Sequence, residues 1–437
     1  MKAAAFARPT ALAMSVVMLG ALTGCILKKP PDTAAIKEEA LPTVEVPAEW
    51  RPSTSAGPGD IADNWLSTFH DDQLTAAVVE AIAHNGDLRV AAARVEQAVL
   101  YAKQAGARLY PTADLLARGG GKMSGDQSGL QGAALTITWE LDIWGRVRYG
   151  RAAAAADAAS VQADFAYARQ SIAATVARSW FLATEAGLQA EVARAAIRDN
   201  ESLVRLSEDR SRIGVGNDEE VYVARATAGA SRDNLRQVEL AREQAIRGLE
   251  ILVGRYPAAA AVVTPTLPGQ PPAIPAGLPS QLLERRPDVI AAERRIAAAF
   301  NRVHEAKAAR LPAIALTTGV SSISSELFVL QERDNPIWNF GANLVMPIFR
   351  GGALKTQVEI RTAEQKQAVA AYAAVGLRAF DLVQTQFKVG STDLRFVTQR
   401  QLALSAARSA LIRVQAEQRV QRVNLHLALG GNFEQKQ

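Results

Sequence analysis

The sequence contains two stretches that present the same features in the same order. In the first stretch Asp87 begins a helical pattern that ends before Pro111, and in the second Asp288 and Pro312 hold the matching places. The two aspartates and the two prolines are each 201 positions apart. A shared offset indicates an internal repeat, so each half is expected to fold into the same supersecondary unit.

After each of these prolines, the spacing of apolar residues changes from helical to alternating. From Leu135 to Ile143 every odd position is apolar and every even position is polar, which is typical of a two-faced β-strand. Weaker alternation elsewhere predicts two strands per half, at about 113–120, 132–143, 313–322 and 337–347. The apolar face is expected to carry Leu135, Ile137, Trp139, Trp338 and Phe340.

Strands of this kind fit two structures, a half-buried soluble sheet and part of a membrane β-barrel. The large aromatic residues on the apolar face, together with the amino-terminal features described next, favour the barrel. Because the smallest transmembrane barrels have about eight strands, a chain with four would need further copies of itself to close one.

The first 24 residues have the features of an export signal. Lys2 and Arg8 precede an apolar run from Ala11 to Leu22, which is too short to span a bilayer stably. The alternative interpretation of this segment is an ordinary signal peptide followed by a chance cysteine.

The run ends in Leu22-Thr23-Gly24-Cys25, which resembles the lipobox of bacterial lipoproteins. The resemblance implies cleavage before Cys25, lipid on its sulfur and on the new amino group, and retention in the outer membrane because Ile26 is not aspartate. Each acyl CH₂ contributes about 0.8 kcal/mol of membrane affinity, so several chains would anchor the protein.

A helical hairpin is predicted in the first half. Nothing breaks the helical pattern from Arg146 to Arg212, and 67 helical residues would span about 100 Å. A second helix is expected from about Glu219 to Val253. The turn between the two helices holds Gly214, Gly216, Asn217 and Asp218, which suit left-handed backbone and helix capping.

The second half is shorter. Trp144 and Gly214 are 70 positions apart, whereas Phe349 and the matching Gly390 are 41 apart, so 29 positions are missing. A last helix is expected from about Leu394 to Leu429. The expected organisation is a signal peptide (1–24), a lipid anchor with an extended proline-rich segment (25–60), the first repeat (61–253), a proline-rich linker (254–279) and the second repeat (280–437).

Composition argues against several other functions. The formal net charge of +5 is spread along the chain without blocks of like charge, which disfavours a nucleic-acid surface. The four histidines are far apart, and Gly119-Gly120-Gly121-Lys122 lacks the remainder of a phosphate-binding loop. No catalytic residue, metal site or cofactor is therefore expected, and the chain is not expected to be an enzyme.

Several stretches, taken in order, resemble the TolC-like outer-membrane efflux proteins, in particular the lipidated branch that serves resistance-nodulation-division pumps. They are Trp65-Leu66-Ser67-Thr68-Phe69, Trp139 to Arg146, Leu283 to Val289, Pro347-Ile348-Phe349 and Ala428-Leu429-Gly430-Gly431. The resemblance implies a mainly α fold, in which long coiled-coil helices form a trimeric α-barrel and four strands per chain join a twelve-stranded transmembrane β-barrel.

The same resemblance implies partners and contact residues. The partners would be two further copies of the chain, outer-membrane lipid, a periplasmic adaptor protein and an inner-membrane pump of the resistance-nodulation-division type. The adaptor would contact Gly214 to Asp218 and a second turn with Gly390, Ser391 and Asp393. Asp381 is the only carboxylate near the place of an acidic constriction.

Two alternatives stay open at this point. One is an exit duct for secreted proteins of the type I kind, although such members usually lack a lipobox. The other is a lipidated periplasmic coiled-coil adaptor, which would have no use for two-faced strands between its helices. The expected function is passive conduction of small molecules by a lipid-anchored channel that extends from the outer membrane into the periplasm.

Overall fold

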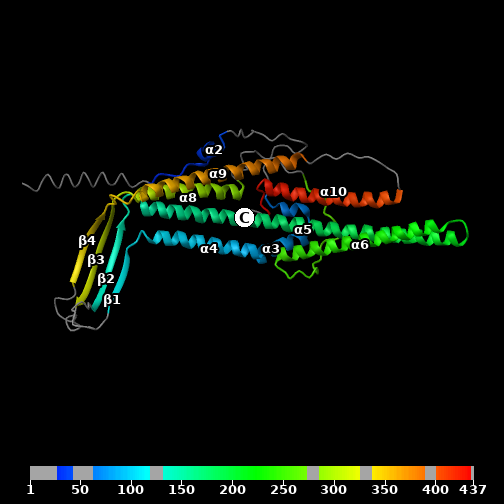
Figure 1. Cartoon of the computed structure of the whole chain (residues 1–437), viewed down its shortest axis with the longest axis horizontal. Helices are drawn as coiled ribbons and strands as arrows, with labels where there is room; N and C mark the ends of the chain where they lie inside the picture. The colour runs from blue at the N-terminus through cyan, green and yellow to red at the C-terminus, as the bar shows by residue number, and fades with distance from the viewer. Residues whose placement is uncertain are drawn as a thin grey trace, which may run out of the picture. The chain divides into compact units, whose positions relative to one another are not determined.

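The computed structural model describes residues 27–42, 63–118, 131–272, 285–324, 337–388 and 400–434. Within them the chain is mainly helical with one four-stranded sheet, which confirms the predicted fold class (Figure 1). Cys25, Gly390, Ser391 and Asp393 lie outside these ranges, and Asp381 lies in a helix whose side chains at that point are outside the description.

Most residues of the described ranges lie in helices, which Figure 1 labels. They are α2 (Thr33–Ala40), a short 3₁₀ helix (Trp65–Phe69), α3 (Asp72–His84), α4 (Gly86–Ala107), α5 (Arg146–Arg212), α6 (Asp218–Val253), α8 (Pro287–Ala308), α9 (Ala353–Lys388) and α10 (Arg400–Ala428). Among the described residues, no helix combines the length and the apolar character that a membrane crossing requires.

The chain divides into two compact units, and each draws on both halves of the sequence. The first unit consists of residues 1–43, 95–162 and 291–373, and the second of residues 44–94, 163–290 and 374–437. The first unit contains the sheet, and the second contains most of the buried aromatic side chains. The repeat boundaries of the sequence therefore do not coincide with the compact units.

The sheet is antiparallel throughout, with the strand order β1-β2-β3-β4. Its strands are β1 (Thr112–Arg118), β2 (Gln131–Leu141), β3 (Ala313–Ser324) and β4 (Ile337–Val345). The second strand was expected to reach residue 143, but it stops at Leu141 because Asp142 turns to cap the next helix. The fourth was expected to reach 347, but Pro347 has no N–H to offer a ladder.

A 3₁₀ helix and the start of α3 close the core of the second unit. Trp65 and Phe69 are buried, and the Phe69 ring lies 5.1 Å from the ring of Phe181 on α5. Asp71 caps α3 by accepting a hydrogen bond from the Leu74 N–H at 3.0 Å, and it accepts another from the Trp180 indole at 3.0 Å. The capping carboxylate therefore ties α3 to α5.

In the same unit, Glu250 at the end of α6 holds the start of the proline-rich linker. Its carboxylate accepts hydrogen bonds of 2.7 to 2.8 Å from the backbone N–H groups of Ala259, Ala260 and Ala261. Burial alone would raise the pKa of Glu250, but these hydrogen bonds stabilise the charged form and bring its pKa below the ordinary value.

Candidate functional site

The strand register gathers apolar side chains on one face of the sheet. Leu135 pairs with Val320, which pairs in turn with Trp338, and cross-strand partners point to the same side. That face carries Ala113, Leu115 and Ala117 from β1; Ala133, Leu135, Ile137, Trp139 and Leu141 from β2; Ile314, Leu316, Thr318 and Val320 from β3; and Trp338, Phe340, Ala342 and Leu344 from β4.

The opposite face of the sheet is polar or small over most of its area. Its members include Thr112, Asp114 and Arg118 from β1, Thr136, Thr138 and Glu140 from β2, Thr317, Gly319 and Ser321 from β3, and Asn339, Gly341 and Asn343 from β4. Gly319 allows close strand packing, because a Cβ at that position would lie 2.7 Å from the Leu135 carbonyl oxygen.

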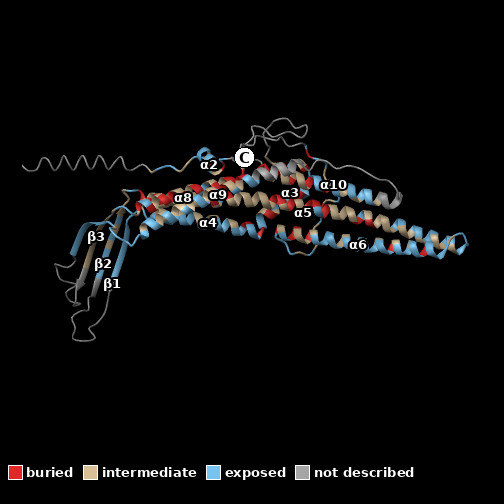
Figure 2. Cartoon of the chain, turned by 45° about the horizontal axis from the view of Figure 1, so that its top comes forward, coloured by how far each residue is buried: buried red, intermediate tan, exposed pale blue. Residues whose placement is uncertain are grey.

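The apolar face is largely exposed among the residues that the structure describes. Trp338 is 76% exposed and Phe340 is 80% exposed, which is far more than such large aromatic side chains normally show in water. Leu135, Ile137 and Trp139 lie on the same face and are about 40% exposed at most. No described strand residue is buried, and Figure 2 shows the strands in the colours of exposed and intermediate residues.

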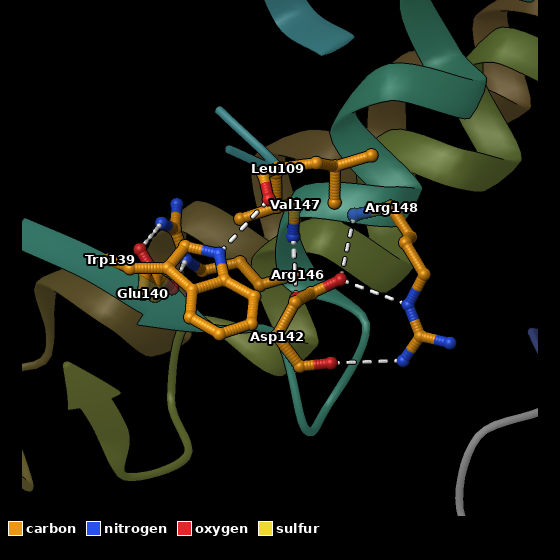
Figure 3. Close-up of polar contacts among 7 residues, drawn as sticks. All are labelled: Leu109, Trp139, Glu140, Asp142, Arg146, Val147 and Arg148. Carbon is orange, nitrogen blue, oxygen red and sulfur yellow. Dashed lines mark hydrogen bonds and ion pairs between the residues drawn. The ribbon is translucent and has the colours of Figure 1, made fainter. Parts of the chain in front are cut away.

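The sheet joins the long helix α5 through a cluster of polar contacts (Figure 3). Asp142 accepts hydrogen bonds of 2.9 Å from the backbone N–H groups of Val147 and Arg148, and one of 3.0 Å from Arg148 Nε. These bonds satisfy helix N–H groups that have no partner within the helix. Gly145 makes the turn possible with a φ of +75°.

Two further contacts hold the same junction. Arg146 donates to both carboxylate oxygens of Glu140, with Nε 3.0 Å from Oε1, and this hydrogen bonding raises the pKa of the Arg146 guanidinium. The Trp139 indole N–H donates to the Leu109 carbonyl oxygen at 3.0 Å, at the end of the preceding helix (Figure 3). The junction of β2 with α5 is thereby held by Asp142 and by the Glu140–Arg146 pair, and Trp139 ties β2 to the segment that follows α4.

The resemblance to efflux proteins rests partly on these junction residues, but the sequence alone assigns them no contacts. One sequence feature does point to Asp142, since an aspartate just before a long helical pattern is typical of a helix start. The bond from the Trp144 indole to the Pro312 carbonyl oxygen, at 2.8 Å, joins positions 168 residues apart. No local pattern would have revealed that contact.

The turn at the far end of α5 is built as its residue types suggest. Gly214 has a φ of +76°, and the N–H groups of Val215 and Gly216 each donate to the Arg210 carbonyl oxygen at 3.0 Å. Asn217, and not Asp218, is the cap of α6, because its side chain accepts from the Glu220 N–H at 2.8 Å. Asp218 instead accepts a hydrogen bond from the Ser211 hydroxyl.

The surface of this turn is apolar at its outermost positions and acidic beside them. Ile213 is 72% exposed and Val215 is 64% exposed. The first turn of α6 follows with Asp218, Glu219 and Glu220, where negative charge favours a helix N-terminus. The turn therefore combines two exposed aliphatic side chains with three acidic ones.

The two halves differ in helix length, as the sequence spacing predicts. The first helix after the sheet, α5, has 67 residues, whereas its counterpart α9 has 36, a difference of 31. At about 1.5 Å per residue these helices span roughly 100 Å and 54 Å. Among the described residues, no three histidine, cysteine, aspartate or glutamate side chains gather as a metal site would require.

Long helices attached to a two-faced antiparallel sheet define the fold of outer-membrane efflux channels. The family model described as outer membrane efflux protein matches residues 77–255 and 278–380, more than half of the chain. The chain therefore belongs to the outer membrane efflux protein family.

Relatives and solved structures agree with this family. The cation efflux system protein CusC of Escherichia coli (strain K12) is 30% identical, over 89% of this chain and 87% of its own length. The pyoverdine export outer membrane protein OpmQ of Pseudomonas aeruginosa is 28% identical, over 89% and 91%. The CmeC outer membrane channel of Campylobacter jejuni has the same fold, with a TM-score of 0.80 at 21% identity over 94% of this chain and 95% of its own.

Proposed function

We propose that this protein is the outer-membrane channel subunit of a tripartite efflux pump and conducts small molecules passively across the periplasm and the outer membrane. The observation that carries the proposal is the strand register. It brings most of the apolar side chains of the four strands to one face, as lipid contact requires, and leaves mainly small and polar side chains on the other, as a wet lumen requires, with Leu116, Ile337 and Val345 among the exceptions.

Closure of the sheet supports a trimer. β1 and β4 are the edges of the sheet, and unpaired backbone groups at an edge cost several kcal/mol each in lipid. Four strands fall short of the roughly eight that the smallest barrels contain, whereas three copies supply twelve. Pairing of β4 with the next copy's β1 would remove both edges.

The helical part suits a tube that extends away from the membrane. The turn from Ile213 to Asp218 joins α5 to α6 at the end away from the sheet. It would present the contact surface that a periplasmic adaptor uses. Energy would come from an inner-membrane pump, with this chain acting as a passive path within the outer membrane efflux protein family. The relatives are named for different cargoes, cations and pyoverdine, which fits a passive duct.

A lipid anchor at Cys25 would attach at the correct end of the sheet. The described chain begins at Leu27, and the Lys28 N–H donates to the Tyr149 hydroxyl at 2.9 Å in the first turns of α5. Ile36 of α2 is buried, and Thr33 donates to Glu293 on α8. The amino-terminal segment is therefore fastened where the strands meet the helices, which is the inner edge of the proposed barrel.

A pair of variants on opposite faces of one strand tests the proposal. Phe340→Asp places a charge on the apolar face, and Asn339→Asp places the same charge one position away on the polar face. A basic side chain facing lipid costs about 2 to 4 kcal/mol at the bilayer centre and a carboxylate costs less, so Phe340→Asp should sharply reduce recovery of trimer from the outer membrane and should leave a deletion strain sensitive to drugs or metals.

Asn339→Asp should retain both trimer and efflux, since it faces the proposed lumen. Recovery of the wild-type protein as a freely soluble monomer, or equal tolerance of the two substitutions, would reject the channel. Inner-membrane recovery on a sucrose gradient would instead favour an adaptor, and loss of protein secretion without drug sensitivity would favour an exit duct.

A further inference from the structure

The first unit contains a charged pocket of about 200 Å³ beside the junction of β2 with α5. The end of α4, the start of α5 and the last turns of α8 line it. Its charged side chains are four arginines and two carboxylates, namely Arg108, Arg146, Arg151, Arg302, Asp157 and Glu305. A pocket of this size is smaller than those that hold drug-sized molecules, so it suits one charged group of a larger solute or a small ion.

Two of the four arginines are paired within the chain. Arg302 forms an ion pair with Asp157, and Arg146 forms one with Glu140 at the end of β2. The pKa of Arg146 is raised by its hydrogen bond with Glu140 and further by the nearby charge of Glu305. The carboxylates around the pocket are therefore engaged mainly with Arg146 and Arg302.

The other two arginines leave the pocket with an excess of positive charge. Arg108 and Arg151 are exposed, and within the described ranges neither side chain forms an ion pair or a hydrogen bond. Arg151 reaches α4, because its Cδ and Nε atoms are each 3.7 Å from the point that a Cβ at Gly106 would occupy. Arg108 follows Gly106 by two residues, so both unpaired arginines line the same pocket.

The pocket lies on the side of α5 and α8 away from the amino-terminal segment. The Lys28 N–H donates to the Tyr149 hydroxyl, and the Tyr149 ring stacks on His304 of α8 at 5.1 Å. Arg151 comes two residues after Tyr149 and Arg302 two residues before His304, so each lies about 160° round its helix from that contact. A segment that leads to a lipid anchor runs outside a tube, so the pocket opens toward the lumen.

The polar face of the sheet leads to the same placement. Glu140 belongs to that face, and its partner Arg146 lines the pocket. The polar face is the lumen side of the proposed barrel, so the pocket continues the lumen side from the strands onto the helices. A solute that passes from the helical part into the barrel would therefore meet Arg108 and Arg151.

We propose that this pocket is an oxyanion site in the wall of the duct, where Arg108 and Arg151 bind the phosphate or carboxylate group of a passing solute. The inference rests on the proposed function and adds a class of solute to it. The planar guanidinium group offers parallel N–H donors that match the oxygens of phosphate and carboxylate. Three copies would repeat the site at one level of the tube, and rings of arginine favour anions in pores.

Inorganic phosphate tests the binding step. Compared with sodium chloride at equal ionic strength, phosphate should raise the melting temperature of the detergent-purified protein by about 1 to 2 °C, because a ligand of the folded state stabilises that state. Arg108→Gln/Arg151→Gln should lose the shift, and Arg108→Gln alone, which leaves the contact of Arg151 with α4 intact, should reduce it. Lys103→Gln is the matched control and should keep the shift, since Lys103 lies about 140° round α4 from Arg108.

Conduction tests whether the site faces the lumen. In planar bilayers under a gradient of potassium chloride, the two arginine variants should shift the reversal potential toward the potassium equilibrium value, because fewer anions would enter the duct. Lys103→Gln should leave the reversal potential unchanged.

Native electrophoresis, run separately, keeps the two proposals distinguishable. A monomer that does not conduct would refute the proposed function. A conducting trimer that phosphate does not stabilise, or stabilises equally with and without the two arginines, would overturn the inference alone. Phosphate binding with an unchanged reversal potential would also overturn it, because the site would then lie outside the lumen, where a lipid headgroup could reach it.

Discussion

The two helical hairpins of this protein descend from one repeated pattern but are supported in different ways. Within the first hairpin, α5 and α6 are linked directly along their length, from Arg194 with Glu239 to Glu208 with Arg225 near the turn. In the second, the described polar contacts of α10 lead to α5, to the linker and to Arg286 before α8, as in Arg178 with Asn424, and none of those between described side chains leads to α9. The first hairpin supports itself, whereas the second depends on the first.

The two hairpins also differ in how they are joined to the sheet. The start of α5 is held by side chains, through Asp142 and the Glu140–Arg146 pair. The start of α9 is shaped by backbone conformation, since Gly351 and Gly352 have φ values of +55° and +82° and the Ala353 N–H bonds back to Arg350. The same turn can thus be encoded by polar side chains or by glycine.

The largest expected effect comes from removing the cap of the first junction. Asp142→Ala deprives two helix N–H groups and the Arg148 guanidinium of their acceptor, and should lower the free energy of unfolding by about 2 kcal/mol. Heat denaturation of the detergent-purified protein measures this. Asp114→Ala, on the exposed strand β1, is the control and should change little; equal effects would show that the junction is not held by side chains.

The stability of the protein should fall in acid because of a histidine near the end of α10, in the second hairpin. His426 on α10 is buried against Trp65, and burial, aided by Arg422, lowers its pKa to about 3 from an ordinary 6.5. Between these values the unfolded state binds a proton that the folded state does not, so stability falls as pH falls, by about 2 kcal/mol from pH 7 to pH 5.

His426→Leu should therefore flatten the fall in melting temperature between pH 7 and pH 5. The replacement leaves no unpaired ring nitrogen, whereas Nδ1 of His426 is buried without a hydrogen bond. His70→Leu, on the exposed turn before α3, serves as the matched control and should leave the pH dependence as it is. An unchanged slope in His426→Leu would locate the acid sensitivity elsewhere.

A smaller effect is expected at the glycine junction. Gly352→Ala forces a residue with a Cβ into left-handed backbone and should cost about 1 kcal/mol. Gly341→Ala, in a strand with open space around the site, should cost much less. The difference between their melting temperatures measures how far this junction relies on glycine, and equal values would contradict that reliance.

The smallest effect is expected near the turn of the first hairpin. Arg225 and Glu208 form an ion pair, but their side chains are 58% and 39% exposed. Arg225→Ala should therefore change stability by less than about 0.5 kcal/mol, and added salt should hide even that. A larger loss would show that the ion pairs, rather than apolar packing, hold α5 and α6 together.

Much of this architecture can be predicted from residues that are close together in the sequence. Alternating residues defined the strands, an unbroken helical pattern defined α5, and Gly214 with Asn217 defined the turn, because each depends on neighbours within a few positions. The shortened second hairpin was also visible, as 29 missing positions in the spacing and 31 residues between the lengths of α5 and α9.

Tertiary structure alone decided which strand faces coincide. A slip of one residue in the pairing of Leu135 with Val320 would have turned the apolar side chains of one strand to the polar face. The same holds for the bond from Trp144 to Pro312 and for the burial of His426 against Trp65, since both join residues far apart in the chain. Local sequence sets periodicity, whereas register and burial depend on contacts that exist only when distant segments meet.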